Sequence, residues 1–166
     1  MGFSAFVPVA TTPVDLTTKT PQVSVRRERP VGLSLKLVLS SDPRLLGAVR
    51  GAVRELASGA GFAEEDCRAI TLAVDEALTN IIRHAYDNRP DESVELTCRS
   101  LENGLEFILR DRGRPVDPAK VCARSLEAVT PGGLGTHIIR QIMDQVCYEP
   151  LPDGNQLRLV KYVNKS

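Results

Sequence analysis

Glu76 and Asn80 stand one helical turn apart in Glu-Ala-Leu-Thr-Asn, a spacing suited to phosphate chemistry. The carboxylate can accept a proton or hold a water molecule, and the amide oxygen is a hard ligand for a Mg²⁺ ion that bridges phosphates. His84 follows after one more turn, on the same stripe. Taken alone, the three side chains also fit an ordinary solvated helix face, so this first block needs support from elsewhere in the chain.

A second block, Asp111-Arg-Gly113, stands where a strand-like segment ends. Residues 105–109 alternate as in a strand, so Asp111 is expected where that strand meets a loop. A carboxylate there can accept a hydrogen bond from an exocyclic amine such as that of adenine, and Gly113 admits a ligand close to the backbone because it has no Cβ. A simple turn of Asp and Gly explains the same residues.

A third block places Gly132, Gly133 and Gly135 just before Thr136 and a segment of helical periodicity, residues 136–146. The free N–H groups and the dipole of a helix start attract phosphate. The block lacks the Gly-Lys-Ser/Thr of a Walker loop and the preceding strand of a dinucleotide fingerprint. It therefore predicts an anion site of another kind.

The elements that must position these blocks can be predicted from the spacing of apolar residues. In chain order they are a strand (33–39), a helix from Asp42 to the glycines at 59 and 61, a helix (67–85), a hairpin (94–98 and 105–109), a helix (136–146) and a second hairpin (146–148 and 156–163). This order predicts an α+β protein, a two-layer α/β sandwich whose mixed, mostly antiparallel sheet has helices on one face.

Composition narrows the class of function. The chain has 166 residues, 42% of them hydrophobic, and a formal net charge of zero, so one core is expected and neither nucleic acid nor an anionic membrane is favoured as a partner. No segment reaches the ~18 apolar residues of a membrane span, and the N-terminus lacks the order of a signal peptide, which favours the cytoplasm. Residues 1–32 have no sustained periodicity and are expected to form a flexible tail before a domain at 33–166.

The four cysteines do not indicate a metal site. Cys67, Cys98, Cys122 and Cys147 are scattered without a Cys-x-x-Cys pair. We interpret them as buried or half-buried thiols.

In this order, the three blocks resemble the N, G1 and G2 boxes of the GHKL ATPase superfamily, most closely the bacterial anti-sigma factor serine/threonine-protein kinases. The resemblance covers roughly residues 33–163, and its most specific parts are Glu-Ala-Leu-Thr-Asn followed by Arg-His-Ala-Tyr, and Gly-Gly-Leu-Gly leading to Ile-Met-Asp-Gln-Val. It implies a histidine-kinase-like ATPase domain, the Bergerat fold, with ATP and Mg²⁺ as cofactors.

The same resemblance implies roles for single residues. Glu76 would be the general base that activates a serine hydroxyl, Asn80 would hold Mg²⁺, and Asp111 would recognise the adenine amine. The other residues implied in nucleotide binding are Gly113, Gly132, Gly133, Gly135, Thr136 and His84. For His84, we favour a ring that packs against Tyr86 and is hydrogen-bonded at the helix end over a catalytic role.

Two features leave the strength of catalysis open. Pro115 stands where the family often has a second glycine, and the segment 117–131, which corresponds to the ATP lid, is short, with Lys120 and Arg124 as its cations. One hypothesis is an anti-sigma factor and kinase that phosphorylates a STAS-domain anti-anti-sigma factor and also binds a sigma factor, with a homodimer possible. The other is a nucleotide-sensing partner-binding module with little or no kinase activity.

Overall fold

The computed structural model describes residues 32–114 and 134–163. Its elements are β1 (Ser34–Ser40), a 3-10 turn (Pro43–Leu45), α1 (Leu46–Gly59), α2 (Glu64–Asn80), a π-helical turn (Ile81–Ala85), β2 (Ser93–Leu101), β3 (Gly104–Asp111), α4 (Leu134–Ile142), β4 (Gln145–Leu151) and β5 (Gly154–Tyr162). The predicted order of strands and helices is confirmed. The tail before residue 32, Cys122, Pro115 and the lid segment with Lys120 and Arg124 lie outside the described residues.

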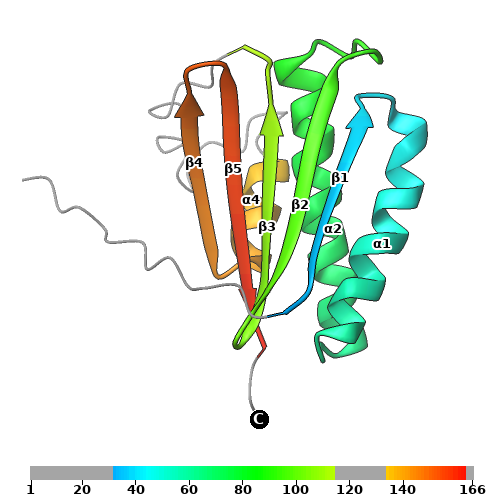
Figure 1. Cartoon of the computed structure of the whole chain (residues 1–166), viewed down its shortest axis with the longest axis vertical. Helices are drawn as coiled ribbons and strands as arrows, with labels where there is room; N and C mark the ends of the chain where they lie inside the picture. Colours follow the sequence, from blue (N-terminus) through cyan, green and yellow to red (C-terminus); the bar gives the residue numbers. More distant parts are fainter. Residues whose placement is uncertain (1–31, 115–133, 164–166) are drawn as a thin grey trace, which may run out of the picture.

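The strands form one sheet in the order β1-β2-β3-β5-β4. All four pairings are antiparallel, so the described part of the sheet contains no parallel pair. Helices α1, α2 and α4 lie together behind the sheet in Figure 1 and cover one of its faces. The predicted two-layer α+β sandwich is therefore confirmed, with β3 at its centre.

Alternation along the strands builds the core between these two layers. Phe107 and Leu109 of β3 and Leu159 of β5 point toward the helices and are fully buried. Ile70 of α2 and Ile139 of α4 meet them from the helix layer and are also fully buried. Each such side chain stabilises the fold by about 1.5–3 kcal/mol through apolar burial, which fixes both helices on the same face.

The first helix begins with a capped turn. The Asp42 side chain accepts a hydrogen bond from the Arg44 backbone N–H at 2.9 Å, and Pro43 occupies the first position of the 3-10 turn. Gly61 then follows the end of α1 with φ at 88°, a left-handed backbone conformation that glycine adopts readily. The predicted cap and stop signals are both confirmed.

The helix of the first block ends earlier than its apolar pattern predicts. α2 stops at Asn80, and the next five residues form a π turn in which the Tyr86 N–H donates to the Ile81 carbonyl, 3.2 Å away and five residues back. Asp87 and Asn88 follow with φ of 52° and 62°. The prediction of a single α-helix up to Ala85 was wrong. The last turn is a wider π turn, after which the chain reverses direction toward β2.

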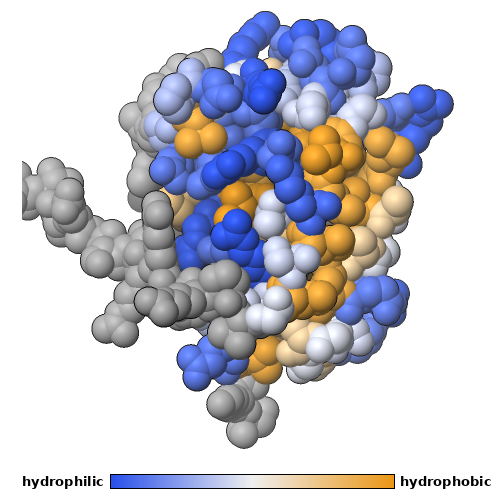
Figure 2. Space-filling model, viewed as in Figure 1, coloured by the Kyte–Doolittle hydropathy of each residue, from blue (hydrophilic) through white to orange (hydrophobic). Residues whose placement is uncertain are grey.

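The open face of the sheet is polar. Glu106 of β3 is buried there and accepts a hydrogen bond from the Arg158 Nε at 2.5 Å, while an Arg99 guanidinium nitrogen lies 3.8 Å from its other oxygen. Figure 2, which looks onto this face, shows many hydrophilic side chains, with hydrophobic ones gathered toward the side of β1. The sheet therefore packs against helices on one face and carries a charged network on the other.

The cysteines described by the structure have the expected burial. Cys67 and Cys98 are buried, and Cys147 is half-buried. Burial raises the pKa of the Cys98 thiol to about 12, with a smaller contribution from the Glu106 carboxylate. In the described ranges, no group of three or more His, Cys, Asp or Glu side chains is arranged to hold a metal ion.

Candidate nucleotide site

The first and third blocks meet where α4 begins against α2. A Cβ atom built on Gly135 would lie 2.7 Å from the Glu76 Cδ and still closer to Oε1. Only a glycine allows the half-buried Glu76 carboxylate to lie directly on the α4 backbone here. A candidate base and a candidate phosphate-binding backbone, about 60 residues apart in sequence, are thus in contact.

The neighbouring candidates occupy the same region with different exposure. Asn80 is the last residue of α2 and is half-buried, and Thr136 is half-buried in the first turn of α4. His84 lies in the π turn and is exposed, whereas Tyr86 is almost fully buried. The interpretation of His84 as a ring packed into the helix end is therefore wrong. Gly132 and Gly133 lie outside the described residues.

Asp111 ends β3 with its carboxylate on the helix side of the sheet, where the residue is only 7% exposed. Its Oδ1 accepts hydrogen bonds from the Gly113 backbone N–H and from the Asn155 Nδ2, both at 2.9 Å. Burial raises the pKa of the Asp111 carboxyl, and these two hydrogen bonds oppose the rise. Within the described part of the chain, Oδ2 receives no hydrogen bond, so it is the oxygen that can accept one from a ligand.

Asn155 is a site residue that the sequence interpretation missed. It lies on β5 directly opposite Asp111 and is 5% exposed, and its Nδ2 also donates to the Arg114 carbonyl at 2.9 Å. The amide therefore ties the second block to the last hairpin. The only local signal was a polar residue inside the apolar pattern of residues 154–160, which a turn also explains.

Gly113 connects the second block to the first. A Cβ on this glycine would lie 2.5 Å from the Ala85 Cβ and 2.7 Å from the Ala85 carbonyl oxygen. The Arg114 N–H donates to the same carbonyl at 3.4 Å, and the Arg114 guanidinium pairs with Asp87 at 2.6 Å. The chain leaving β3 therefore runs along the π turn that ends the Glu76 helix.

The buried Tyr86 side chain stabilises this junction through two hydrogen bonds. Its hydroxyl donates to the Ser93 carbonyl at 2.6 Å and accepts a hydrogen bond from the Arg112 backbone N–H at 2.8 Å. Burial raises the pKa of the Tyr86 phenol, so the group stays protonated and can donate. One side chain thus holds the end of the π turn, the start of β2 and the end of β3 together.

These contacts fit an adenine nucleotide at both ends of the site. Asp111 offers a carboxylate oxygen at one end, and Glu76 with Gly135 offers a carboxylate beside a helix start at the other. Both ends are linked through α2 and its π turn. Few protein ligands suffice for Mg²⁺ at such a site, because the ion usually takes one or two protein oxygens together with phosphates and water.

Comparison with known proteins gives a family-level match. Residues 39–161 match the family described as the histidine kinase-like ATPase domain. The chain is 27% identical over 141 residues to the serine-protein kinase RsbW of Bacillus pumilus, covering 79% of this chain and 86% of that protein. It is 30% identical over 142 residues to the RsbW of Listeria monocytogenes serotype 4a, covering 79% of this chain and 88% of that protein.

A solved structure shares the fold. The RsbU and RsbW domains of Rv1364c from Mycobacterium tuberculosis superpose with a TM-score of 0.60 at 14% identity, over 81% of this chain and 34% of that longer chain. Of the helices that the structure describes, none is long and apolar enough to cross a membrane.

Proposed function

Because the chain belongs to the histidine kinase-like ATPase domain family and is similar over most of its length to serine-protein kinases of that family, we propose that it is a protein-serine kinase and anti-sigma factor. Its substrate is a STAS-domain anti-anti-sigma factor, and its alternative partner is a sigma factor. Residues 33–166 form the kinase domain in this proposal, and residues 1–32 form a tail.

The contact between Glu76 and Gly135 is the observation that carries the proposal. A protein that only senses a nucleotide needs a phosphate-binding helix start but no carboxylate beside it. A kinase needs both, because a group that accepts the proton of the attacking hydroxyl must lie close to the phosphate-binding backbone.

In this proposal each site residue has one role in phosphoryl transfer or nucleotide binding. Glu76 accepts the serine hydroxyl proton on its carboxylate, and Asn80, one turn along α2, holds Mg²⁺ through its amide oxygen. Asp111 accepts a hydrogen bond from the adenine amine on Oδ2, since Oδ1 already has two donors. Gly113 lines the base pocket, and Gly132, Gly133, Gly135 and Thr136 bind the phosphates. Bound ATP supplies the phosphoryl group, and Mg²⁺ neutralises part of its charge.

The test separates binding from transfer. Titration calorimetry of the full chain with ATP and with GTP, each with and without Mg²⁺, measures affinity, and ³²P transfer from γ-labelled ATP to purified STAS-domain proteins of the same organism measures activity. We expect Mg²⁺-dependent binding that prefers ATP to GTP, and incorporation of label into a serine of one STAS protein. GTP binding as tight as that of ATP contradicts the role of Asp111.

A pair of helix variants tests the base. Glu76→Gln is expected to keep ATP affinity within about threefold and to lower transfer by about 10²-fold or more, the usual contribution of a general base. Glu65→Gln is the matched control, because Glu65 is exposed in the first turn of the same helix. Equal loss of binding and transfer in Glu76→Gln means that Glu76 is structural.

The alternative function is a nucleotide-sensing module with little or no transfer. The short lid segment 117–131 favours it, because few cations there are available to the phosphates. ATP-dependent binding of a STAS protein or a sigma factor, without incorporation of label, supports this alternative. Light scattering of the same samples tests whether the chain forms a homodimer.

A further inference from the structure

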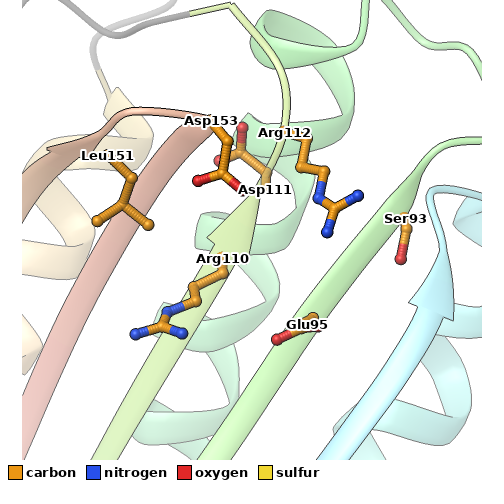
Figure 3. A pocket seen from close by; sticks show the side chains of 7 residues that line it. All are labelled: Ser93, Glu95, Arg110, Asp111, Arg112, Leu151 and Asp153. Atoms are coloured by element: carbon orange, nitrogen blue, oxygen red, sulfur yellow. The ribbon is translucent and has the colours of Figure 1, made fainter.

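The open face of the sheet is hollowed where β3 ends. The hollow has a volume of about 260 Å³ and is lined by side chains of β2, β3 and the β4–β5 hairpin, among them Ser93, Arg110, Arg112 and Asp153 (Figure 3). Because neighbouring residues of a strand point to opposite faces, Arg110 and Arg112 face this hollow while Asp111 between them carries its carboxylate toward the helices. Asp111 also lines the hollow, so the hollow and the nucleotide site share this residue and lie on opposite faces of the sheet.

The two arginines have hydrogen-bonding capacity to spare. The Arg110 Nε donates to the Gln156 Oε1 at 2.7 Å, and its terminal nitrogens have no hydrogen bond or ion pair with the described residues. The exposed Arg112 guanidinium likewise has neither within the described ranges. In Figure 3 it reaches over the strand ends toward Ser93, while Arg110 extends toward β5. Two guanidinium groups thus border one hollow with most of their N–H donors available.

Among the described residues, the acidic neighbours form no hydrogen bond or ion pair with these donors, although the Lys36 hydrogen bond and, to a smaller extent, the charges of Arg110 and Arg112 lower the pKa of the Glu95 carboxyl. Glu95 lines the hollow on β2, but its carboxylate already pairs with the Lys36 ammonium on β1 at 2.9 Å. Asp153 is exposed on the hairpin turn and has no ion pair with the described residues. A carboxylate of a ligand can therefore pair with either guanidinium group, whereas Glu95 and Asp153 oppose a compact dianion such as phosphate more strongly.

We propose that this hollow binds an aspartate or glutamate side chain from an acidic segment of a protein partner. Guanidinium groups present paired N–H donors in the plane that matches a carboxylate. The volume is below the roughly 300–1,000 Å³ of pockets for whole small molecules, and among the described lining residues Leu151 is the only one with a large apolar side chain. A carboxylate carried by a larger interface suits such a site better than a free metabolite, because charge pairs of this kind fix the register of two proteins.

The peptide group between Asp111 and Arg112 connects the hollow to the nucleotide site. The Arg112 backbone N–H donates to the Tyr86 hydroxyl, and the preceding residue is Asp111. A partner that holds the Arg112 side chain therefore holds the backbone next to the proposed adenine contact. The binding site itself does not depend on kinase activity, so it is tested without nucleotide.

The test uses NMR of the arginine Nε–Hε signals in the ¹⁵N-labelled full chain. The probe is an acetylated and amidated tetrapeptide, Gly-Glu-Asp-Gly, and the controls are the neutral Gly-Gln-Asn-Gly peptide and inorganic phosphate. We expect the acidic peptide to shift the Arg110 and Arg112 signals in a saturable way at millimolar concentrations. Absence of a shift, equal shifts with the neutral peptide, or tighter binding of phosphate than of the acidic peptide overturns the proposal.

Charge-removing variants locate the site. Arg112→Gln and Arg110→Gln are each expected to raise the dissociation constant of the acidic peptide about tenfold, since each removes a charge-assisted pair of hydrogen bonds. Arg68→Gln is the matched control, because Arg68 is an exposed arginine of α2 and lies on the helix side of the molecule. A dissociation constant that changes as much in Arg68→Gln as in Arg112→Gln means that only net charge matters and overturns the assignment.

Discussion

Replacement of Tyr86 by phenylalanine tests the junction that joins the first two blocks. The ring remains in place, and only the hydroxyl that donates to the Ser93 carbonyl at 2.6 Å and accepts from the Arg112 N–H at 2.8 Å is lost. Each hydrogen bond contributes about 0.5–1.5 kcal/mol net, and leaving its partner unsatisfied in a buried place raises the loss. We therefore expect Tyr86→Phe to lower the free energy of unfolding by about 2–3 kcal/mol.

Urea unfolding followed by far-UV circular dichroism measures this loss. With a slope of about 1–3 kcal/mol per molar urea, the midpoint is expected to fall by roughly 1 M or more at an unchanged slope. Tyr148→Phe is the matched control, because Tyr148 is half-buried and its hydroxyl makes no hydrogen bond with the described residues. A loss below about 1 kcal/mol in Tyr86→Phe, or an equal loss in both variants, refutes the bridging role.

Three further changes probe the site and the core. Burial raises the pKa of Asp111, and the hydrogen bond from Asn155 lowers it. Asn155→Leu removes that hydrogen bond, so the pKa of Asp111 is expected to rise further. Because a protonated carboxyl accepts a hydrogen bond from the adenine amine more weakly than a carboxylate does, lowering the pH is expected to weaken ATP binding at a higher pH than in the parent chain, as calorimetry can measure; an unchanged pH profile contradicts this. Gly113→Ala is expected to cost about 1–3 kcal/mol in urea unfolding because its Cβ meets the π turn, whereas Gly51→Ala, with nothing within 4 Å, is neutral or stabilising. Cys98, whose pKa is raised to about 12, is expected to stay unmodified by an aromatic disulfide reagent at pH 8 until urea unfolds the chain, as peptide mass mapping can show.

Local pattern was sufficient to predict most of the fold. Apolar residues of α2 at helical spacing, Ile70, Val74, Ala77 and Leu78, are all buried, because a helix packed on a sheet must present one stripe to it. The turn before β3 was predicted from Glu-Asn-Gly, and Gly104 is needed there because a Cβ would clash with the backbone of residue 161. Such features depend on residues close together in sequence.

The partners of the site residues could not be predicted in this way. Asn155 meets Asp111 across 44 residues, and the Tyr86 hydroxyl reaches the Arg112 N–H across 26. Contacts of this kind depend on strand register and on the order of strands in the sheet, which apolar periodicity does not specify. The π turn was missed for another reason. Over five residues, a backbone hydrogen bond to the fifth preceding residue and one to the fourth are compatible with the same pattern of apolar residues, so the pattern does not distinguish a π turn from an α-helix.

The alternation of Arg110, Asp111 and Arg112 at the end of β3 restricts how this strand can change during evolution. Insertion or deletion of one residue between the Gly104 turn and Asp111 would exchange the two faces of everything beyond it. An arginine would then enter the proposed adenine pocket, and the aspartate would stand among the side chains of the open face. Variants of this strand are therefore expected to differ by substitution and to keep its length, while changes of length collect in the loops at either side.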